Sequence, residues 1–296
     1  GMALGLTQYV IFRRNLGTHG RTVAHPLSRQ AFWRAAAVAA AVLAVIGAGF
    51  ATGVVKLSNL SQVTTALIIL ASIAYFTAML TSSRVSPLER TRVRAFIPLF
   101  IANAVFWSLF QQIFTVLAVY SDERMNWSIF GWTAPSSWIG SIEPVWIILL
   151  SPLFAVMWTK LGRRAPTTPR KFAYGVIGVG LAFLMFLSMA GTSGRSVPVL
   201  VVVVIMAVFA ISELLLSPIG LSVTTQLAPN AFRAQMMALY FFSVGLGTAM
   251  SGVLARYYDA AHEAAYFGII GAVAVAVGLV VWVLAPRISA LMEGVH

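Results

Sequence analysis

Eight apolar stretches, each long enough to cross a lipid bilayer, dominate this sequence of 296 residues. The hydrocarbon core of a bilayer is about 30 Å thick, so a spanning helix needs about 20 predominantly apolar residues. Within lipid only helices and closed barrels satisfy all backbone hydrogen bonds, and stretches of this length indicate helices. The sequence therefore predicts an all-α polytopic membrane protein, with spans near residues 35–55, 63–80, 95–120, 138–159, 172–190, 197–221, 235–255 and 264–285.

The composition excludes a soluble globular enzyme. Only 9% of the residues are charged, against about 25% in an ordinary soluble domain, and this is too few to cover a water-exposed surface. The chain has no cysteine, which excludes a disulfide framework, a thiolate metal site and a cysteine nucleophile. No paired histidines at ligand spacing and no nucleophile with a base stand in the spans, so we expect no enzyme activity, no metal and no cofactor.

The distribution of basic residues predicts the orientation of the spans. Sixteen of the twenty Lys and Arg residues lie in loops and tails on one side of the predicted spans, and four lie on the other. Because basic loops face the cytoplasm, the C-terminus is expected there, in a multi-pass protein of the bacterial inner (cell) membrane. The net charge of +12 therefore favours the lipid bilayer, rather than nucleic acid, as the partner of the basic residues.

The remaining segments divide the chain by composition. Residues 1–12 are apolar but too short to span, and are interpreted as the tail of a truncated transmembrane helix. Residues 13–34 predict a cytoplasmic linker, and 35–82 a transmembrane helix pair that is rich in small residues and serves packing rather than chemistry. The other six spans occupy 95–285, followed by a cytoplasmic tail at 286–296.

One carboxyl group falls deep inside a span and is therefore a functional candidate. Glu213 lies about sixteen residues into its helix, roughly 24 Å of helix rise. Pro218 cannot donate to the carbonyl of Leu214, which predicts a bend just beyond the carboxyl group. Ser217 stands four residues after Glu213 on the same helix face, and a polar face within lipid must point into the bundle or a wet cavity.

Glu143 is a second acid within a span, five residues into its helix and directly before Pro144. It is either functional or a solvated carboxylate that interacts with the helix dipole near the outer surface. No Lys or Arg lies at the depth of Glu143 or Glu213. Such acids must be protonated, meet a cationic ligand, or pair with residues that this chain lacks, which leaves proton coupling and ammonium binding as the functional alternatives.

A third polar group lies in the span at 95–120, where Gln111 and Gln112 follow Trp107. Paired glutamines within a membrane need hydrogen-bond partners. They either bind a polar substrate or join neighbouring helices. Trp107 stands on the same face as Gln111, so it either packs between helices or lines a cavity.

Three stretches resemble one family, the proton-dependent oligopeptide transporters of the major facilitator superfamily. They are Phe106 to Arg124, Ser141 to Phe172 and Ser212 to Arg256, and the Ser-Glu-Leu…Ser-Pro-Ile-Gly run at Ser212–Gly220 is the most specific match. The resemblance implies the C-terminal six-helix bundle of the major facilitator fold plus two inserted helices, giving eight spans and a partial one. It also implies a missing N-terminal six-helix bundle as partner, and di/tripeptides and protons as the transported species.

The resemblance assigns roles residue by residue. It implies that Glu213 meets the amino terminus of the peptide and that Ser217 and Trp107 line the cavity, with Gln111, Gln112, Glu143 and Tyr240 completing the substrate-binding set. Many members have a carboxylate where Gln111 stands, commonly Asn where Glu143 stands, and Trp where Tyr240 stands. We therefore expect proton coupling to involve Glu213 and Glu143, unless Glu143 marks a sequence drifting without selection.

The expected function is the C-terminal portion of a proton-coupled di/tripeptide symporter that works by alternating access and is not competent for transport alone. Two alternatives stay open. One is a major facilitator transporter for another solute, such as nitrate, a sugar or a drug. The other is a non-transporting truncated membrane scaffold or pseudotransporter.

Overall fold

A computed structural model of the protein describes residues 2–13, 28–129, 131–192 and 194–294. The chain divides into two compact units, Gly1–Leu57 and Ser58–His296, which are described separately. Most of the linker expected at 13–34 lies outside the described residues, as do Gly1 and the end of the tail expected at 286–296.

The first unit contains two helices, α1 (Met2–Phe12) and α2 (Arg29–Ala51). The side chain of Ser28 caps α2 by accepting a hydrogen bond from the backbone N–H of Ala31 at 3.2 Å, which fixes the first turn. This cap places the start of α2 six residues before the predicted position. The apolar side chains of α2 are largely exposed within its own unit, as expected for a helix whose environment is lipid.

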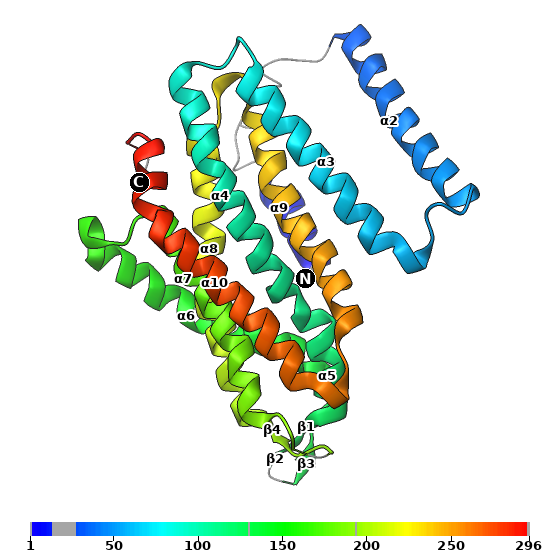
Figure 1. Ribbon diagram of the computed structural model, residues 1–296, viewed down its shortest axis with the longest axis vertical. Coiled ribbons are helices and arrows are strands. Elements are labelled where there is room, and N and C mark those ends of the chain that lie inside the picture. Colours follow the sequence, from blue (N-terminus) through cyan, green and yellow to red (C-terminus); the bar gives the residue numbers. More distant parts are fainter. Residues whose placement is uncertain (1, 14–27, 130, 193, 295–296) are drawn as a thin grey trace. The chain divides into compact units, whose positions relative to one another are not determined.

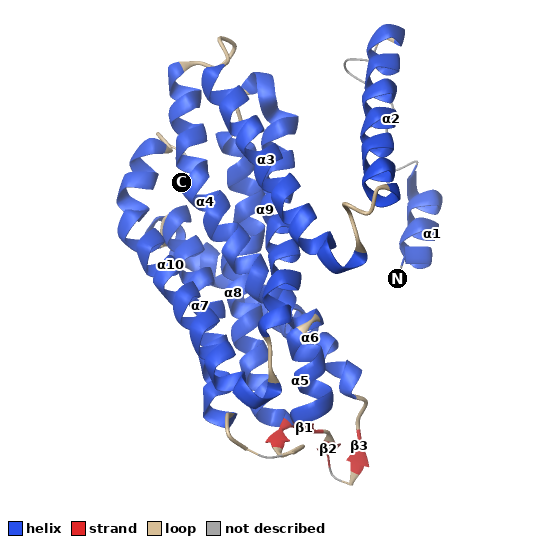
Figure 2. Cartoon of the chain, turned by 45° about the vertical axis from the view of Figure 1, so that its right-hand side comes forward, coloured by secondary structure: helices blue, strands red, loops and turns tan. Residues whose placement is uncertain are grey.

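The second unit is a helical bundle with a few very short strands at one end (Figures 1 and 2). Within the described part of the chain, eight helical segments, α2 among them, are long and apolar enough to cross a membrane, which confirms the predicted all-α polytopic class. The helices of this unit are α3 (Leu60–Thr81), α4 (Pro87–Phe110), α5 (Val116–Arg124), α6 (Ile139–Leu161), α7 (Thr168–Met185), α8 (Val199–Leu227), α9 (Arg233–Leu254) and α10 (Glu263–Leu291).

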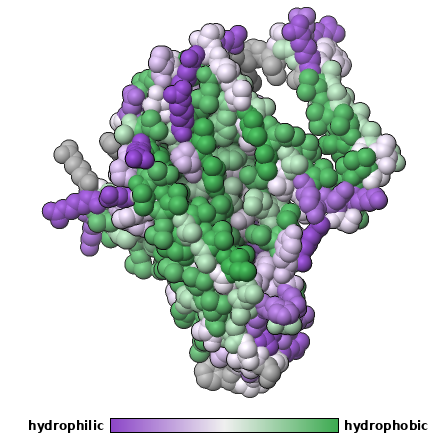
Figure 3. All heavy atoms as spheres, in the orientation of Figure 1, coloured by the Kyte–Doolittle hydropathy of each residue, from purple (hydrophilic) through white to green (hydrophobic). Residues whose placement is uncertain are grey.

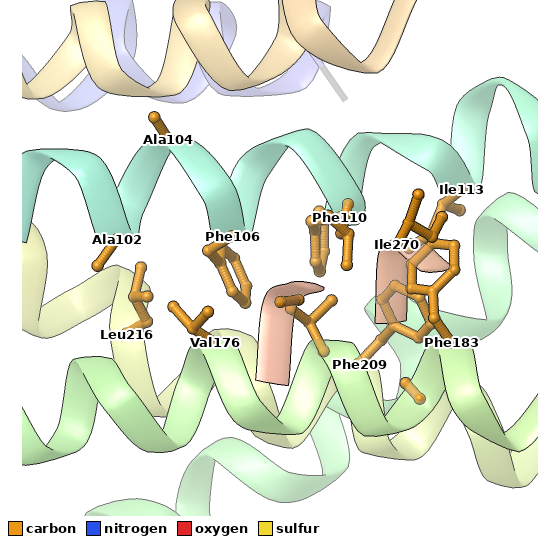
Figure 4. Packing of buried hydrophobic residues seen from close by; sticks show 14 of the residues in the cluster. Ala102, Ala104, Phe106, Phe110, Ile113, Val176, Phe183, Phe209, Leu216 and Ile270 are labelled. Carbon is orange, nitrogen blue, oxygen red and sulfur yellow. The ribbon is translucent and has the colours of Figure 1, made fainter. Parts of the chain in front are cut away.

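Aromatic side chains from α4, α7 and α8 fill the core of the bundle (Figure 4). Phe110 of α4 and Phe183 of α7 both contact Phe209 of α8, with ring centroids 6.1 and 5.5 Å apart. α7 and α10 approach closely at Gly180 and Gly271. A Cβ on Gly180 would lie only 2.8 Å from the carbonyl oxygen of Gly271, so a larger residue does not fit there. Small residues at such crossings let membrane helices approach closely, and this contact helps to hold α10 against the core.

The predicted span at 95–120 is interrupted in the structure. α4 begins earlier, at Pro87, because Ser86 and Glu89 form a reciprocal capping box at its start. α4 ends at Phe110, and a 3₁₀ turn over Gln111–Phe114 precedes α5. Two of the four residues in this turn are glutamines, but apolar residues flank the turn on both sides, so a hydropathy window does not reveal the break.

Polar contacts tie the helices together at both ends of the second unit, on either side of an apolar band over the visible face (Figure 3). At the end that carries the C-terminus, a carboxylate oxygen of Glu89 accepts from the backbone N–H of Asn230 at 2.9 Å. At the other end, Arg124 donates to both carboxylate oxygens of the buried Glu263, at 2.7 and 3.1 Å. Here β1 (Met125–Asn126) pairs in parallel with β4 (Val197–Pro198), and β2 (Ser128–Ile129) pairs antiparallel with β3 (Trp132–Thr133).

Candidate functional site

A cavity of about 580 Å³ lies among α4, α6, α8 and α9 of the second unit. Most of its wall is apolar, including Ile147, Leu214, Leu221 and Val244. Its polar groups come from a small number of side chains on different helices. A mostly apolar cavity with a few converging polar groups is the usual form of a small-molecule site, so this cavity is the candidate functional site.

α8 contributes the carboxyl group of the cavity wall. Glu213 and Ser217 stand four residues apart on α8 and both line the cavity, as the helical spacing predicted. Pro218 follows in the same wall, and α8 continues through it to Leu227. The proline therefore does not end the helix, and the carbonyl of Leu214 next to Glu213 has no backbone donor at Pro218.

Aromatic side chains from α4 and α9 form the facing walls. Tyr240 is buried, and its hydroxyl donates to the backbone carbonyl of Ser217 at 3.4 Å. Gly220 makes room for this ring, because a Cβ there would lie 2.9 Å from the Cε2 atom of Tyr240. Trp107 also lines the cavity, and its Nε1 is buried without a hydrogen-bond partner among the described residues. The indole N–H of Trp107 is therefore enclosed in the wall and is not exposed to the cavity.

Glu143 lies behind this wall rather than in solvent. Its side chain is on α6, is only 6% exposed, and lies within hydrogen-bonding reach of the Glu213 carboxyl group. Its Oε1 atom is buried and has no partner among the described residues. The structure therefore contradicts the interpretation of Glu143 as a solvated carboxylate at the helix entry.

The two glutamines take separate positions, and neither belongs to the cavity wall. Gln111 donates to the hydroxyl of Thr248 on α9 at 3.0 Å. Gln112 is fully buried in the bundle, and its side-chain oxygen accepts from the hydroxyl of Tyr266 at 3.1 Å. Both side chains join neighbouring helices, which is the structural alternative that the sequence left open.

Ser151 lines the cavity and was missed by the sequence analysis. It follows Glu143 and Ile147 at intervals of four residues along α6, so all three share one face of that helix. Helical periodicity counted from Glu143 was the signal that would have found it. The residues that line the cavity include no Lys, Arg or His, and within the described ranges no cluster of His, Asp and Glu could hold a metal ion.

A bundle of membrane-spanning helices around a mostly apolar cavity with a few polar groups is typical of a solute transporter. The family model described as "POT family" matches residues 2–276. The chain belongs to this family, whose proteins are transporters and not enzymes.

Two relatives that match the whole chain are longer than it is. The chain is 38% identical to the uncharacterized transporter YclF of Bacillus subtilis (strain 168), matching 100% of this chain and 60% of that protein. It is 35% identical to the di-/tripeptide transporter of Lactococcus lactis subsp. cremoris, matching 100% of this chain and 62% of the relative. The chain thus spans about 60% of the length of these relatives.

Solved structures agree with this assignment. A crystal structure of the peptide transporter POT in complex with sulfate has a TM-score of 0.88 and 40% identity, covering 99% of this chain and 61% of that one. A crystal structure of a POT family transporter in complex with 5-aminolevulinic acid has a TM-score of 0.84 and 33% identity, covering 97% of this chain and 61% of that one. The major facilitator fold predicted from the sequence is therefore confirmed.

Proposed function

We propose that this chain forms the C-terminal six-helix bundle and two inserted helices of a proton-coupled symporter for di- and tripeptides. The names of relatives that are similar over most of the chain support a peptide substrate. In this proposal the bundle pairs with an N-terminal six-helix bundle, and the site opens alternately to the two sides of the membrane. The chain alone contributes only one wall of the substrate site.

The observation that carries the proposal is the Glu213 carboxyl group in a mostly apolar cavity whose lining has no cationic side chain. The natural ligand of such a group is a cation, and the amino terminus of a short peptide is a primary ammonium group. Ser217 adds a polar contact, while Trp107, Tyr240 and the apolar wall contact peptide side chains. Gln111 and Gln112 act here by holding the helices that carry these groups.

The test is uptake into liposomes that contain this chain together with the N-terminal part of the Lactococcus lactis di-/tripeptide transporter. We expect dipeptide uptake driven by a pH gradient, and none with this chain alone. Glu213→Gln should weaken dipeptide binding at least about 30-fold, equal to about 2 kcal/mol, because it leaves the ammonium group without its counter-charge. Glu123→Gln is the matched control, since Glu123 is exposed at the end of α5.

Two results would contradict this proposal. The first is equal binding of a dipeptide and its N-acetylated form, which lacks the ammonium group. The second is unchanged binding in Glu213→Gln. Preference for an uncharged solute would favour a major facilitator transporter of another substrate, and absence of any uptake with the complementing part would favour a non-transporting scaffold.

We also propose that the protein lies in the bacterial inner membrane with its C-terminus in the cytoplasm. Support comes from the basic residues, which gather in the loops on the side of the C-terminus. The chain has no cysteine, so one introduced thiol reports on one position. In intact cells, a membrane-impermeant maleimide should label a cysteine at Asn126 and not one at Glu293; the reverse result would contradict the orientation.

A further inference from the structure

The carboxyl groups of Glu143 and Glu213 lie side by side, although they come from different helices, α6 and α8. Only Glu213 forms part of the cavity wall. Glu143 is buried behind it, 6% exposed, with its Oε1 atom lacking any partner among the described residues. The pair therefore has one member that a ligand can reach and one that is shielded from the cavity.

No cation lies close enough to neutralise this pair in the described structure. On α9, Tyr240 is the nearby ionisable group, and its hydroxyl is bonded to the carbonyl of Ser217. Lys171 of α7 lies over the ring of Trp158, 4.4 Å from its centroid, and lines a separate cavity of about 220 Å³. The other ionisable residues of the helices packed on α8 lie in the first two turns or the last turn of their helices: Glu89, Arg90, Arg92 and Arg94 of α4, Lys160 of α6, Arg170 and Tyr174 of α7, and Arg233 of α9.

Two adjacent carboxylates at this depth would carry two negative charges in a medium of low dielectric constant. Their repulsion is strong because water does not screen it. A single proton held between neighbouring carboxyl groups removes one of the charges, and such a pair titrates as one unit rather than as two residues. The unpartnered Oε1 of Glu143 is a free acceptor for that proton.

We propose that Glu143 and Glu213 form one two-carboxyl site that binds one proton and one primary ammonium group together. Glu143 holds the proton behind the wall, and Glu213 presents its oxygens to the ammonium group in the cavity. The proposal rests on the proposed function, because it identifies how peptide and proton occupy the same site. It also explains how a chain with Gln111, which cannot titrate, can couple transport to protons.

The net charge of the pair explains why proton binding and peptide binding are coupled, and we call this relation the coupling rule. The two carboxylates carry two negative charges, one bound proton leaves one, and a proton plus an ammonium group leaves none. A net charge in the membrane interior is costly, so the site with both cations bound is the form best suited to closure and reorientation of the bundles. A proton alone or a peptide alone leaves the site charged, and co-transport follows without any further acid on α4.

The direct test is infrared spectroscopy of the 296-residue chain in lipid nanodiscs, which detects the carbonyl stretch of a protonated carboxyl group. At neutral pH we expect such an absorption in the wild type and its loss in the double variant Glu143→Gln/Glu213→Gln. Each single glutamine variant keeps one buried carboxyl group, so its absorption should shift in frequency, whereas Glu123→Gln should leave the absorption unchanged. Glu143→Asp keeps an acid at this position and should keep the absorption at a shifted frequency, which separates chemistry from misfolding. Absence of the absorption in the wild type, or an unchanged absorption in either single glutamine variant, would overturn the proposal.

Calorimetry in two buffers of different ionisation enthalpy tests the coupling rule and uses a dipeptide as the probe. At alkaline pH, where the shared proton has left, dipeptide binding to the wild type should take up about one proton. Glu143→Gln should bind the dipeptide without proton uptake, and equal uptake in this variant would overturn the coupling rule. If the infrared result is as expected and no dipeptide binds even with the complementing N-terminal part, the peptide function fails while the two-carboxyl site stands.

Discussion

Gly247→Ala is expected to separate α4 from α9 and to disturb the cavity. A Cβ at Gly247 would lie 2.6 Å from the Cβ of Trp107, 2.7 Å from the carbonyl oxygen of Ala104 and 2.8 Å from the backbone nitrogen of Ser108. Two of these three atoms are backbone, so no rotamer change relieves the clash. Restoring ordinary contact distances requires a helix movement of roughly 0.5–1 Å, and overpacking of this kind typically costs about 1–3 kcal/mol.

Gly245→Ala is the matched control, because it lies two residues away on the same helix. Its Cβ would meet only the terminal Cδ1 of Ile68, at 3.4 Å, and that side chain can move. Both substitutions change the backbone entropy of α9 by the same amount, so the difference between the two variants isolates the clash. That difference should be about 1–3 kcal/mol, or roughly 2–12 °C in melting temperature for a protein of this size.

The assay is thermal unfolding of the purified variants in the same detergent, and its readout is the fraction of protein that stays monodisperse at each temperature. Gly247→Ala should also bind dipeptide more weakly than Gly245→Ala, because the clash displaces Trp107 from the cavity wall. Equal melting temperatures for the two variants would refute the close packing of α4 on α9. A large melting difference with equal dipeptide affinity would refute the role of Trp107 in the site.

Further predictions concern the ends and the crossing points of the bundle. Glu263→Gln leaves the partly buried guanidinium of Arg124 without its counter-charge, and unfolding measurements should show a loss of about 1.5–3 kcal/mol, against less than about 0.5 for the exposed Glu123→Gln. Gly180→Ala should cost about 1–3 kcal/mol by forcing α7 away from α10, measured in the same way. Burial and the nearby Glu263 carboxylate raise the pKa of Tyr258 from 10 to about 12, so stability that depends on its neutral phenol is present below pH 10 and lost as the pH rises through about 12. Tyr258→Phe should remove this alkaline loss in melting curves recorded across that pH range, and a wild-type loss that persists in the variant would exclude the phenol as its cause.

The fold class could be read from the sequence because lipid leaves so few options for a long apolar stretch. Hydropathy located eight spans, since burial in lipid constrains every residue of a span in the same way. It did not locate the 3₁₀ turn at Gln111–Phe114, because the interruption depends on tertiary hydrogen bonds. Gln112 forms such bonds with α9 and α10, and partners more than 130 residues away leave no local pattern.

The site residues that share one helix face could be predicted from their spacing in the sequence. Glu213 and Ser217 share a face of α8, and their spacing alone placed both in the cavity wall. Trp107 and Tyr240 also lie there, in agreement with the resemblance to a known family. Gln111 and Gln112 do not line the cavity, although the sequence allowed it. Their side chains point in different directions and form hydrogen bonds with residues of other helices.

The burial of Glu143 could not be predicted from the sequence. Its position five residues into a helix is equally compatible with solvent and with burial, and only the packing of α6 on α8 decides between them. Its position beside Glu213 limits which charge states the Glu143 side chain can adopt, and the sequence does not show this limit. A lone buried carboxyl group can be neutralised by a proton or a ligand, whereas two adjacent ones need two cations to become neutral. The described cavity lining holds no Lys or Arg, and in the proposed two-carboxyl site the two cations are a proton and the ammonium group of the substrate.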